Sequence, residues 1–259
     1  DGVVVIDDVD VAVATRAAKV FDTPVKHARV HVGRDSQSKM RLWLDAETEG
    51  DASDGLQIVN ESVLRNVVGD VFADWDLQGP LQTRLKLELN LDEKPQPRVE
   101  LETEWSGVSA NIPGLDLRIE RLSGAAFYKT DSGFSSNGLT AWLWDAPLTA
   151  NLEQELADGK PGPLQVQFEG PVDVDNVREW LDLDLLRFAQ GATDFSATLD
   201  ISGEREVLFR INSTLEGVAL DVPSPIGKAA SEIRDLTVQD RKSTRLNSSH
   251  SSVSRMPSS

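Results

Sequence analysis

Residues 81–91 read LQTRLKLELNL, and this stretch decides the fold class. Leu85, Leu87 and Leu89 stand at every second position, and polar residues such as Lys86 and Glu88 fill the positions between them. Because successive side chains of a β-strand point to opposite faces, the stretch predicts a strand with one apolar and one charged face. Such a strand is typical of an antiparallel sheet that exposes one face to water.

The same alternation recurs along most of the chain and predicts many more strands of this kind. Turn-forming residues separate several of them, at positions 95–97, 131–133 and 158–160. The chain is therefore predicted to be mainly β, with an antiparallel sheet. The alternating apolar residues of the other predicted strands are Val9, Val11 and Val13; Val30 and Val32; Met40, Leu42 and Leu44; Val99, Leu101, Thr103 and Trp105; Leu115, Leu117 and Ile119; Leu164, Val166 and Phe168; Phe195, Ala197, Leu199 and Ile201; and Val207, Phe209 and Ile211.

Two segments have helical spacing instead, and they predict short amphipathic helices over 56–72 and 173–188. Each is followed by a glycine and then by an alternating strand, and Gly191 stands 112 positions after Gly79. We therefore predict a repeated helix–Gly–strand unit near 56–91 and 173–203, within one elongated, modular sheet that spans residues 1–239. The alternative is a chance pair of helices in an α+β domain.

The composition excludes several classes of function. The 259 residues include 43 acidic and 26 basic ones, a net charge of −17, so a phosphate backbone would be repelled and no nucleic-acid partner is expected. The chain has no Cys, which excludes disulfides, thiolate metal sites and Cys nucleophiles. No stretch reaches the roughly 18 apolar residues that a membrane-spanning helix needs.

The search for catalytic chemistry is negative, so we expect no catalytic residues, no metal site and no cofactor. His27 and His31 lie on one face of a predicted strand with Arg29 between them, and Asp35 is the one candidate for a third metal ligand. Two solvent-facing histidines are the preferred interpretation. Residues 223–228 read PSPIGK and lack the glycine spacing of a phosphate-binding loop.

Trp142 and Trp144 flank Leu143 on a predicted strand, so bulky side chains would occupy both of its faces. Two interpretations stay open. The strand is packed in an ordinary core, or its aromatic side chains face lipid or a membrane interface.

The last twenty residues differ in kind from the rest. From Asp240 the chain reads DRKSTRLNSSHSSVSRMPSS, a Ser-rich sequence without apolar periodicity, which predicts disorder. Residues 240–250 also resemble the translation of a common sequencing adapter, so we interpret 240–259 as a tail that is not native to the protein. The chain opens on Asp1 in a strand-like segment, and we interpret it as an internal fragment of a longer protein.

Four segments, in order, resemble one known family. Residues 59–91 resemble its helix, Gly and amphipathic strand; residues 117–153 resemble two successive units of it, the first with a glycine and the second leading to a proline; residues 170–203 resemble a second helix unit; and LEGVALDVPSPIGKAASEIRDLTVQ (215–239) resembles its proline-rich segment. This family is the YhdP branch of the AsmA-like proteins, and the resemblance spans about residues 28–239.

The resemblance implies a fold, a location and a function. Such proteins are anchored in the inner membrane by a helix that this chain does not contain, and they extend through the periplasm of Gram-negative bacteria toward the outer membrane. They are thought to form a long, curled β-sheet with an apolar groove that carries phospholipid. The resemblance thus implies a non-enzymatic lipid-transfer segment with phospholipid as partner and contact with the outer membrane as a possibility.

The alternating apolar positions are the candidates for lining the groove: Leu85, Leu87, Leu89, Leu199, Ile201, Phe209 and Ile211. A sheet with Leu at every second position offers the continuous apolar surface that acyl chains need in water. A structural or assembly scaffold of the envelope is the main alternative, and a carbohydrate-active β-domain is the enzymatic one. A groove leaves the apolar surface accessible, a scaffold buries it as a sandwich core, and an enzyme gathers carboxylates or His in a cleft.

Overall fold

The structure is a computed structural model that describes residues 2–7, 10–15, 19–20, 23–61, 74–92, 97–157, 160–182, 184–202 and 206–243. Its strands are β1 (Gly2–Asp7), β2 (Asp10–Thr15), β3 (Lys19–Val20), β4 (Thr23–Arg34), β5 (Met40–Asp51), β6 (Asp76–Gln78), β7 (Pro80–Asn90), β8 (Arg98–Ile112), β9 (Leu117–Lys129), β10 (Gly133–Leu143), β11 (Ala146–Ala157), β12 (Lys160–Asp173), β13 (Ala189–Ser202), β14 (Glu206–Ser213), β15 (Val218–Leu220) and β16 (Leu236–Ser243). Its helices are α1 (Ala52–Glu61) and α3 (Val174–Leu181), with short 3₁₀ helices η1 (Pro113–Leu115) and η2 (Asp184–Phe188).

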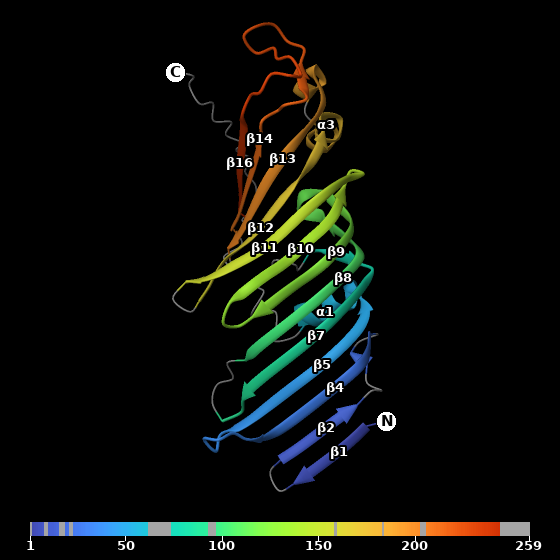
Figure 1. Cartoon of the computed structure of the whole chain (residues 1–259), viewed down its shortest axis with the longest axis vertical. Helices are drawn as coiled ribbons and strands as arrows, with labels where there is room; N and C mark the ends of the chain where they lie inside the picture. Colours follow the sequence, from blue (N-terminus) through green and yellow to red (C-terminus); the bar gives the residue numbers. More distant parts are fainter. Residues whose placement is uncertain are drawn as a thin grey trace.

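All the described strands belong to one antiparallel sheet, which confirms the mainly β prediction. Thirteen strands are successive neighbours in the order β1-β2-β4-β5-β7-β8-β9-β10-β11-β12-β13-β14-β16, while β3, β6 and β15 pair at its margins. Figure 1 shows a long single layer whose strands change direction gradually from the N-terminal to the C-terminal end. The sheet is not strongly curled.

The register places the alternating apolar residues on one face. Leu85 of β7 pairs with Ala46 of β5 on one side and with Leu101 of β8 on the other, and Leu101 pairs with Tyr128 of β9. Because cross-strand partners point to the same face, these side chains form a row that crosses the strands. We call this face of the sheet the apolar face and the other the charged face.

The first helix begins earlier than predicted. α1 starts at Ala52, because the carboxylate of Asp51 accepts hydrogen bonds from the backbone N–H groups of Ser53 and Gly79, both at 2.9 Å. The predicted helix extended to residue 72, and its part from 62 onward lies outside the described residues. So do residues 95–96 and 158–159 of two predicted turns and residues 244–259 of the predicted tail.

The second predicted helix is shorter than expected. The carboxylate of Asp173 accepts a hydrogen bond from the Asp175 N–H at 2.8 Å and caps α3, which covers only the first half of the predicted range. Asp182 then adopts a left-handed backbone conformation (φ 48°), which ends the α-helix before η2.

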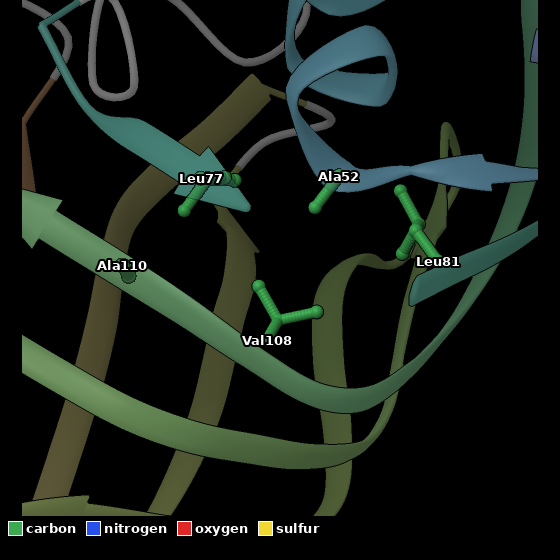
Figure 2. Packing of buried hydrophobic residues seen from close by; sticks show 5 residues of the cluster. All are labelled: Ala52, Leu77, Leu81, Val108 and Ala110. Carbon is green, nitrogen blue, oxygen red and sulfur yellow. The ribbon is translucent and has the colours of Figure 1, made fainter. Parts of the chain in front are cut away.

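The two helix–Gly–strand segments have similar packing. Gly79 and Gly191 both have positive φ, 124° and 108°, and lie against the backbone of Val108 and of Gly217. Figure 2 shows Ala52, Leu77 and Val108 around one small core, and Val174, Ala189 and Val218 form the corresponding core beside α3. These matched contacts are those expected of a repeated unit, although the repeat itself stays a prediction.

Strand β16 crosses the predicted boundary at residue 240. Its backbone pairs with β14 from Leu236 to Ser243, so the first four residues of the predicted tail continue a strand. The non-native origin of residues 240–259 stays a prediction.

The Asp51 cap makes a testable contribution to stability. Burial raises the pKa of Asp51, but the N–H groups of Ser53 and Gly79 stabilise its charged form more, and the net result is a pKa below the usual 3.8. A lowered folded-state pKa means stability that is present above the unfolded pKa and lost as the pH falls through the folded value. We therefore expect Asp51→Asn to lower the free energy of unfolding by about 1 kcal/mol at neutral pH.

The same difference between wild type and Asp51→Asn should shrink as the pH falls below 3.8 and through the lowered folded-state pKa, where the wild-type carboxyl becomes protonated. Urea unfolding at a series of pH values measures it. Glu104→Gln removes an exposed carboxylate of β8 and serves as the matched control. If the difference in the free energy of unfolding stays constant down to the lowest pH, the charge of Asp51 does not stabilise the helix, and the prediction is wrong.

Candidate functional site

The predicted groove residues all lie on the apolar face, in two groups. Leu85, Leu87 and Leu89 belong to β7 and are half-buried. The C-terminal group is Leu199 and Ile201 of β13, which are 7% and 8% exposed, and Phe209 and Ile211 of β14, which are half-buried. Their assignment as lipid contacts stays a prediction.

Two apolar clusters contain most of these residues. Leu85 and Leu87 pack with Val99, Leu101 and Tyr128. Leu199, Ile201 and Phe209 form the second cluster with residues of β11 and β12. Phe134 of β10 packs against both clusters and joins them. The joined side chains, which we call the apolar strip, are Leu85, Leu87, Val99, Leu101, Tyr128, Phe134, Leu152, Leu164, Val166, Phe168, Leu199, Ile201 and Phe209.

Two predicted residues extend the apolar face beyond the strip. Leu89 pairs with Leu42 of β5, and Ile211 pairs with Ala197 and Val238.

The most buried members of the strip were not among the predicted groove residues. Val99 is fully buried and Tyr128 is 5% exposed, and burial is the main cause that raises the pKa of the Tyr128 phenol. The alternation over 99–105 contained the signal for Val99, but nothing local distinguishes it from its neighbours.

One buried amide stands within the apolar strip. Gln154 of β11 is 9% exposed and lies opposite Leu164. Its side chain accepts a hydrogen bond from the Phe134 N–H (3.3 Å) and donates one to the Gly162 carbonyl (2.9 Å). Because both ends of the amide have partners, Gln154 fixes the junction at Phe134 rather than offering a free polar group to a ligand.

The charged face carries a ladder of alternating charges. Arg29, Asp45, Lys86, Glu100 and Lys129 are successive cross-strand partners on β4, β5, β7, β8 and β9. Opposite charges in neighbouring strands stabilise one register and keep this face in water. A shallow depression over the ladder is lined by both signs of charge, so it does not select a ligand of either charge.

The candidate metal ligands have other partners. His31 stacks on Trp43 with ring centres 5.1 Å apart, and His27 lies opposite Glu47 in the register of β4 and β5. Asp35 forms an ion pair with Arg41 and accepts hydrogen bonds from two backbone N–H groups, of which that of Lys39 contributes most to its lowered pKa. Within the described part of the chain, no group of three His, Asp or Glu residues could hold a metal ion.

The lysine of the PSPIGK segment is a structural residue. Lys228 is 5% exposed, and its ammonium donates hydrogen bonds to the carbonyls of Leu215 (2.7 Å), Val218 (2.8 Å) and Ala229 (3.1 Å). Three backbone acceptors use all three of its N–H donors. The segment therefore has no free ammonium for a phosphate, as the glycine spacing already indicated.

The two tryptophans do not share a strand. Trp142 lies on β10 beneath the Arg121 guanidinium, 4.8 Å from its ring centre, whereas Trp144 and Asp145 form the turn to β11 with positive φ. Trp144 contacts Trp180 of α3 at 5.8 Å between ring centres, and the Trp180 indole N–H donates to the Leu115 carbonyl at 2.8 Å. These contacts favour the packing interpretation over a lipid-facing aromatic wall.

Comparison with known proteins yields one match. The family model described as YhdP protein matches residues 2–254. No curated protein and no solved structure matches the chain. Among the helices that the structure describes, none is long and apolar enough to span a bilayer.

Proposed function

The chain belongs to the YhdP family, and on this premise we propose that it shields phospholipid acyl chains along the apolar strip as they pass between the inner and outer membranes. Family membership and a long antiparallel sheet are consistent with an AsmA-like lipid transporter. In the proposal the chain is one segment of a periplasmic protein anchored in the inner membrane outside these residues. Phospholipid is its partner, with contact to the outer membrane as a further possibility.

One observation carries the proposal: the apolar face belongs to a single layer. All described strands lie in one sheet, so none of them forms a second sheet over this face. Half-buried side chains such as Leu87 and Phe209 therefore remain partly accessible on the strip. A sandwich would have buried such residues between two layers about 10 Å apart.

The energetics require a surface of this kind. An acyl chain of about 16 carbons loses on the order of 10 kcal/mol when it leaves a membrane for water, at about 0.8 kcal/mol per CH₂. The strip crosses eight neighbouring strands, from β7 to β14, and at about 4.8 Å between strands it is on the order of 35 Å long. An acyl chain can thus lie along the strip across several strands. The charged face stays in water, and the lipid head group remains solvated.

The proposal needs no bond-making step. Transfer of a lipid along an apolar surface requires neither a nucleophile nor a cofactor, and YhdP proteins are generally non-catalytic. We therefore propose a non-enzymatic role in which the strip residues act only by contact.

A scaffold role is the second candidate, and the C-terminal cluster favours it. Leu164, Val166, Leu199 and Ile201 are each less than 10% exposed, as in a closed core. In a scaffold the apolar face would serve stability alone and would not hold lipid.

Lipid content and transfer separate the two candidates. The chain is purified from the periplasm and its bound phospholipid is measured by mass spectrometry; its transfer of labelled phospholipid between vesicles is then followed by fluorescence. We expect stoichiometric phospholipid and accelerated transfer. A folded chain that carries no phospholipid and leaves transfer at the spontaneous rate would reject the proposal in favour of the scaffold.

A further inference from the structure

Helix α1 lies against the apolar face, at the position where the proposed lipid site begins. Figure 1 shows α1 on one side of the sheet beside β7 and β8. Ile58 and Val59 of α1 pack into the cluster of Val99 and Tyr128, which also contains Leu85 and Leu87. The helix thus covers part of the surface on which an acyl chain would lie.

The other helix, α3, contributes no described side chain to the C-terminal cluster. The described apolar side chains packed against Leu199 and Ile201 come from β10, β11, β12 and β14. α3 instead places Val174 beside Ala189 and Val218, and its Trp180 reaches the Leu115 carbonyl. Among the described residues, the two helices therefore differ in one respect: α1 places side chains in the strip's N-terminal cluster, whereas the described contacts of α3 lie in other clusters.

The attachment of α1 is concentrated at its beginning. Among the described residues, the hydrogen bonds that join it to the sheet lie in its first turn: Asp51 accepts from Gly79, Ala52 donates to the Gly79 carbonyl (2.8 Å), and Thr23 donates to Asp54 (2.7 Å). Figure 2 shows Ala52 inside the small core at this end, where it is fully buried.

Among the described residues, the second half of α1 contacts the sheet through apolar side chains. Ile58 and Val59 are half-buried and contribute apolar contacts, and the Gln57–Glu61 hydrogen bond lies within the helix itself. Gly55, Ile58, Val59 and Asn60 all have weak helix propensity, so the helix depends on its packing against the sheet. A competing apolar group at the same surface can therefore replace these contacts.

We propose that α1 is a displaceable cover of the apolar strip, whose Ile58 and Val59 occupy the surface at Val99 and Tyr128, in the same cluster as Leu85 and Leu87, until an acyl chain replaces them. This inference rests on the proposed function, because it describes how that same site is regulated. The first turn of α1 and Leu56, which packs against the small core of Ala52 and Leu77, act as the fixed end, and residues 57–61 move. The cover limits lipid occupancy at β7–β9 and leaves β12–β14 unaffected.

The test uses the full chain with a photocrosslinking amino acid at Leu87 and, in a second version, at Leu199. Each is incubated with phosphatidylethanolamine vesicles, illuminated and analysed for attached lipid by mass spectrometry. In the double variant Ile58→Ser, Val59→Ser we expect about fivefold more lipid at Leu87, because the covered state no longer competes. The yield at Leu199 should stay unchanged.

The matched control is Gln57→Ser, which makes the same replacement at an exposed position of α1 and should leave both yields unchanged. If the folded double variant gives the same amount of crosslinked lipid at Leu87 as the unaltered chain, or less, the proposal that α1 covers the strip is wrong. Absence of lipid at both positions in every version overturns the proposed function instead, and the cover with it.

Hydrogen exchange on the unaltered chain gives a second readout that needs no variant. We expect faster exchange of the amides of 57–61 in the presence of the same vesicles, and unchanged exchange in α3. Equal exchange of 57–61 with and without vesicles, while lipid crosslinks at Leu87, would also overturn the cover.

Discussion

Replacing Leu87 by glutamate is expected to lower the phospholipid retained by the chain about tenfold, which corresponds to about 1.4 kcal/mol of binding free energy. Leu87 packs with Leu85 and Val99 in the apolar strip. An ionised carboxylate at this position would have to lose its water to let an acyl chain pass, because the side chains that pack around it in this cluster are hydrophobic. Because Leu87 is only half-buried, the new carboxylate can turn to water in the lipid-free protein and the sheet should persist.

The matched control for this variant is Lys86→Gln. It changes the net charge by the same amount on the adjacent residue, whose side chain lies on the charged face. Lipid retention should stay at the wild-type level, and circular dichroism should show both variants folded. An equal loss in the two variants would indicate a general charge effect and would count against the strip as the binding surface.

The second large effect concerns stability. Lys228→Met should lower the free energy of unfolding by about 3 kcal/mol, since three carbonyls lose a charged donor inside the C-terminal loop region. The methionine keeps most of the buried aliphatic volume, so the loss reports the hydrogen bonds rather than a cavity. Leu215 and Ala229 carbonyls keep one other backbone donor each, which limits the effect.

Urea unfolding measures this loss, with Lys129→Met as the control on an exposed lysine of β9. The control should change the free energy of unfolding by less than about 0.5 kcal/mol. An effect of Lys228→Met no larger than that of the control would show that the ammonium is dispensable for the fold of 214–235.

The strands were predictable because their signal is local. Alternation in the stretch 81–91 places each side chain on one of two faces, and the register between β5, β7 and β8 preserves that division across the sheet. The seven candidate residues therefore lie on one face of the sheet, the apolar face. Alternation alone does not show that Val99 and Tyr128 are the most buried residues of their cluster, because their burial depends on strands and a helix distant in the chain.

The helix boundaries were missed for a similar reason. The start of α1 depends on Asp51, whose second hydrogen-bond donor, Gly79, lies 28 residues further along. The end of α3 depends on a left-handed conformation of Asp182, which sequence does not specify as strongly as a glycine would. Likewise, the turn at Trp144 and Asp145 lacks the Asn-Gly type of signal, so Trp144 was assigned to a strand.

The position of α1 over the apolar strip could not be predicted either. Helical periodicity shows that one face of a helix is apolar, but it does not show which surface that face covers. The same periodicity described α3, which packs elsewhere. The curl of the sheet was also beyond the sequence pattern, because strand alternation is the same in flat and in curled sheets.

Photocrosslinking on the two faces of β7 tests the central claim most directly. One version of the full chain carries the photocrosslinking amino acid at Leu87, on the apolar face, and the other carries it at Lys86, on the charged face. Both are expressed in the periplasm, illuminated in living cells and analysed for attached lipid by mass spectrometry. The account predicts phospholipid at Leu87 and none at Lys86. Absence of lipid at Leu87 in the folded protein, or equal amounts at both positions, would contradict it.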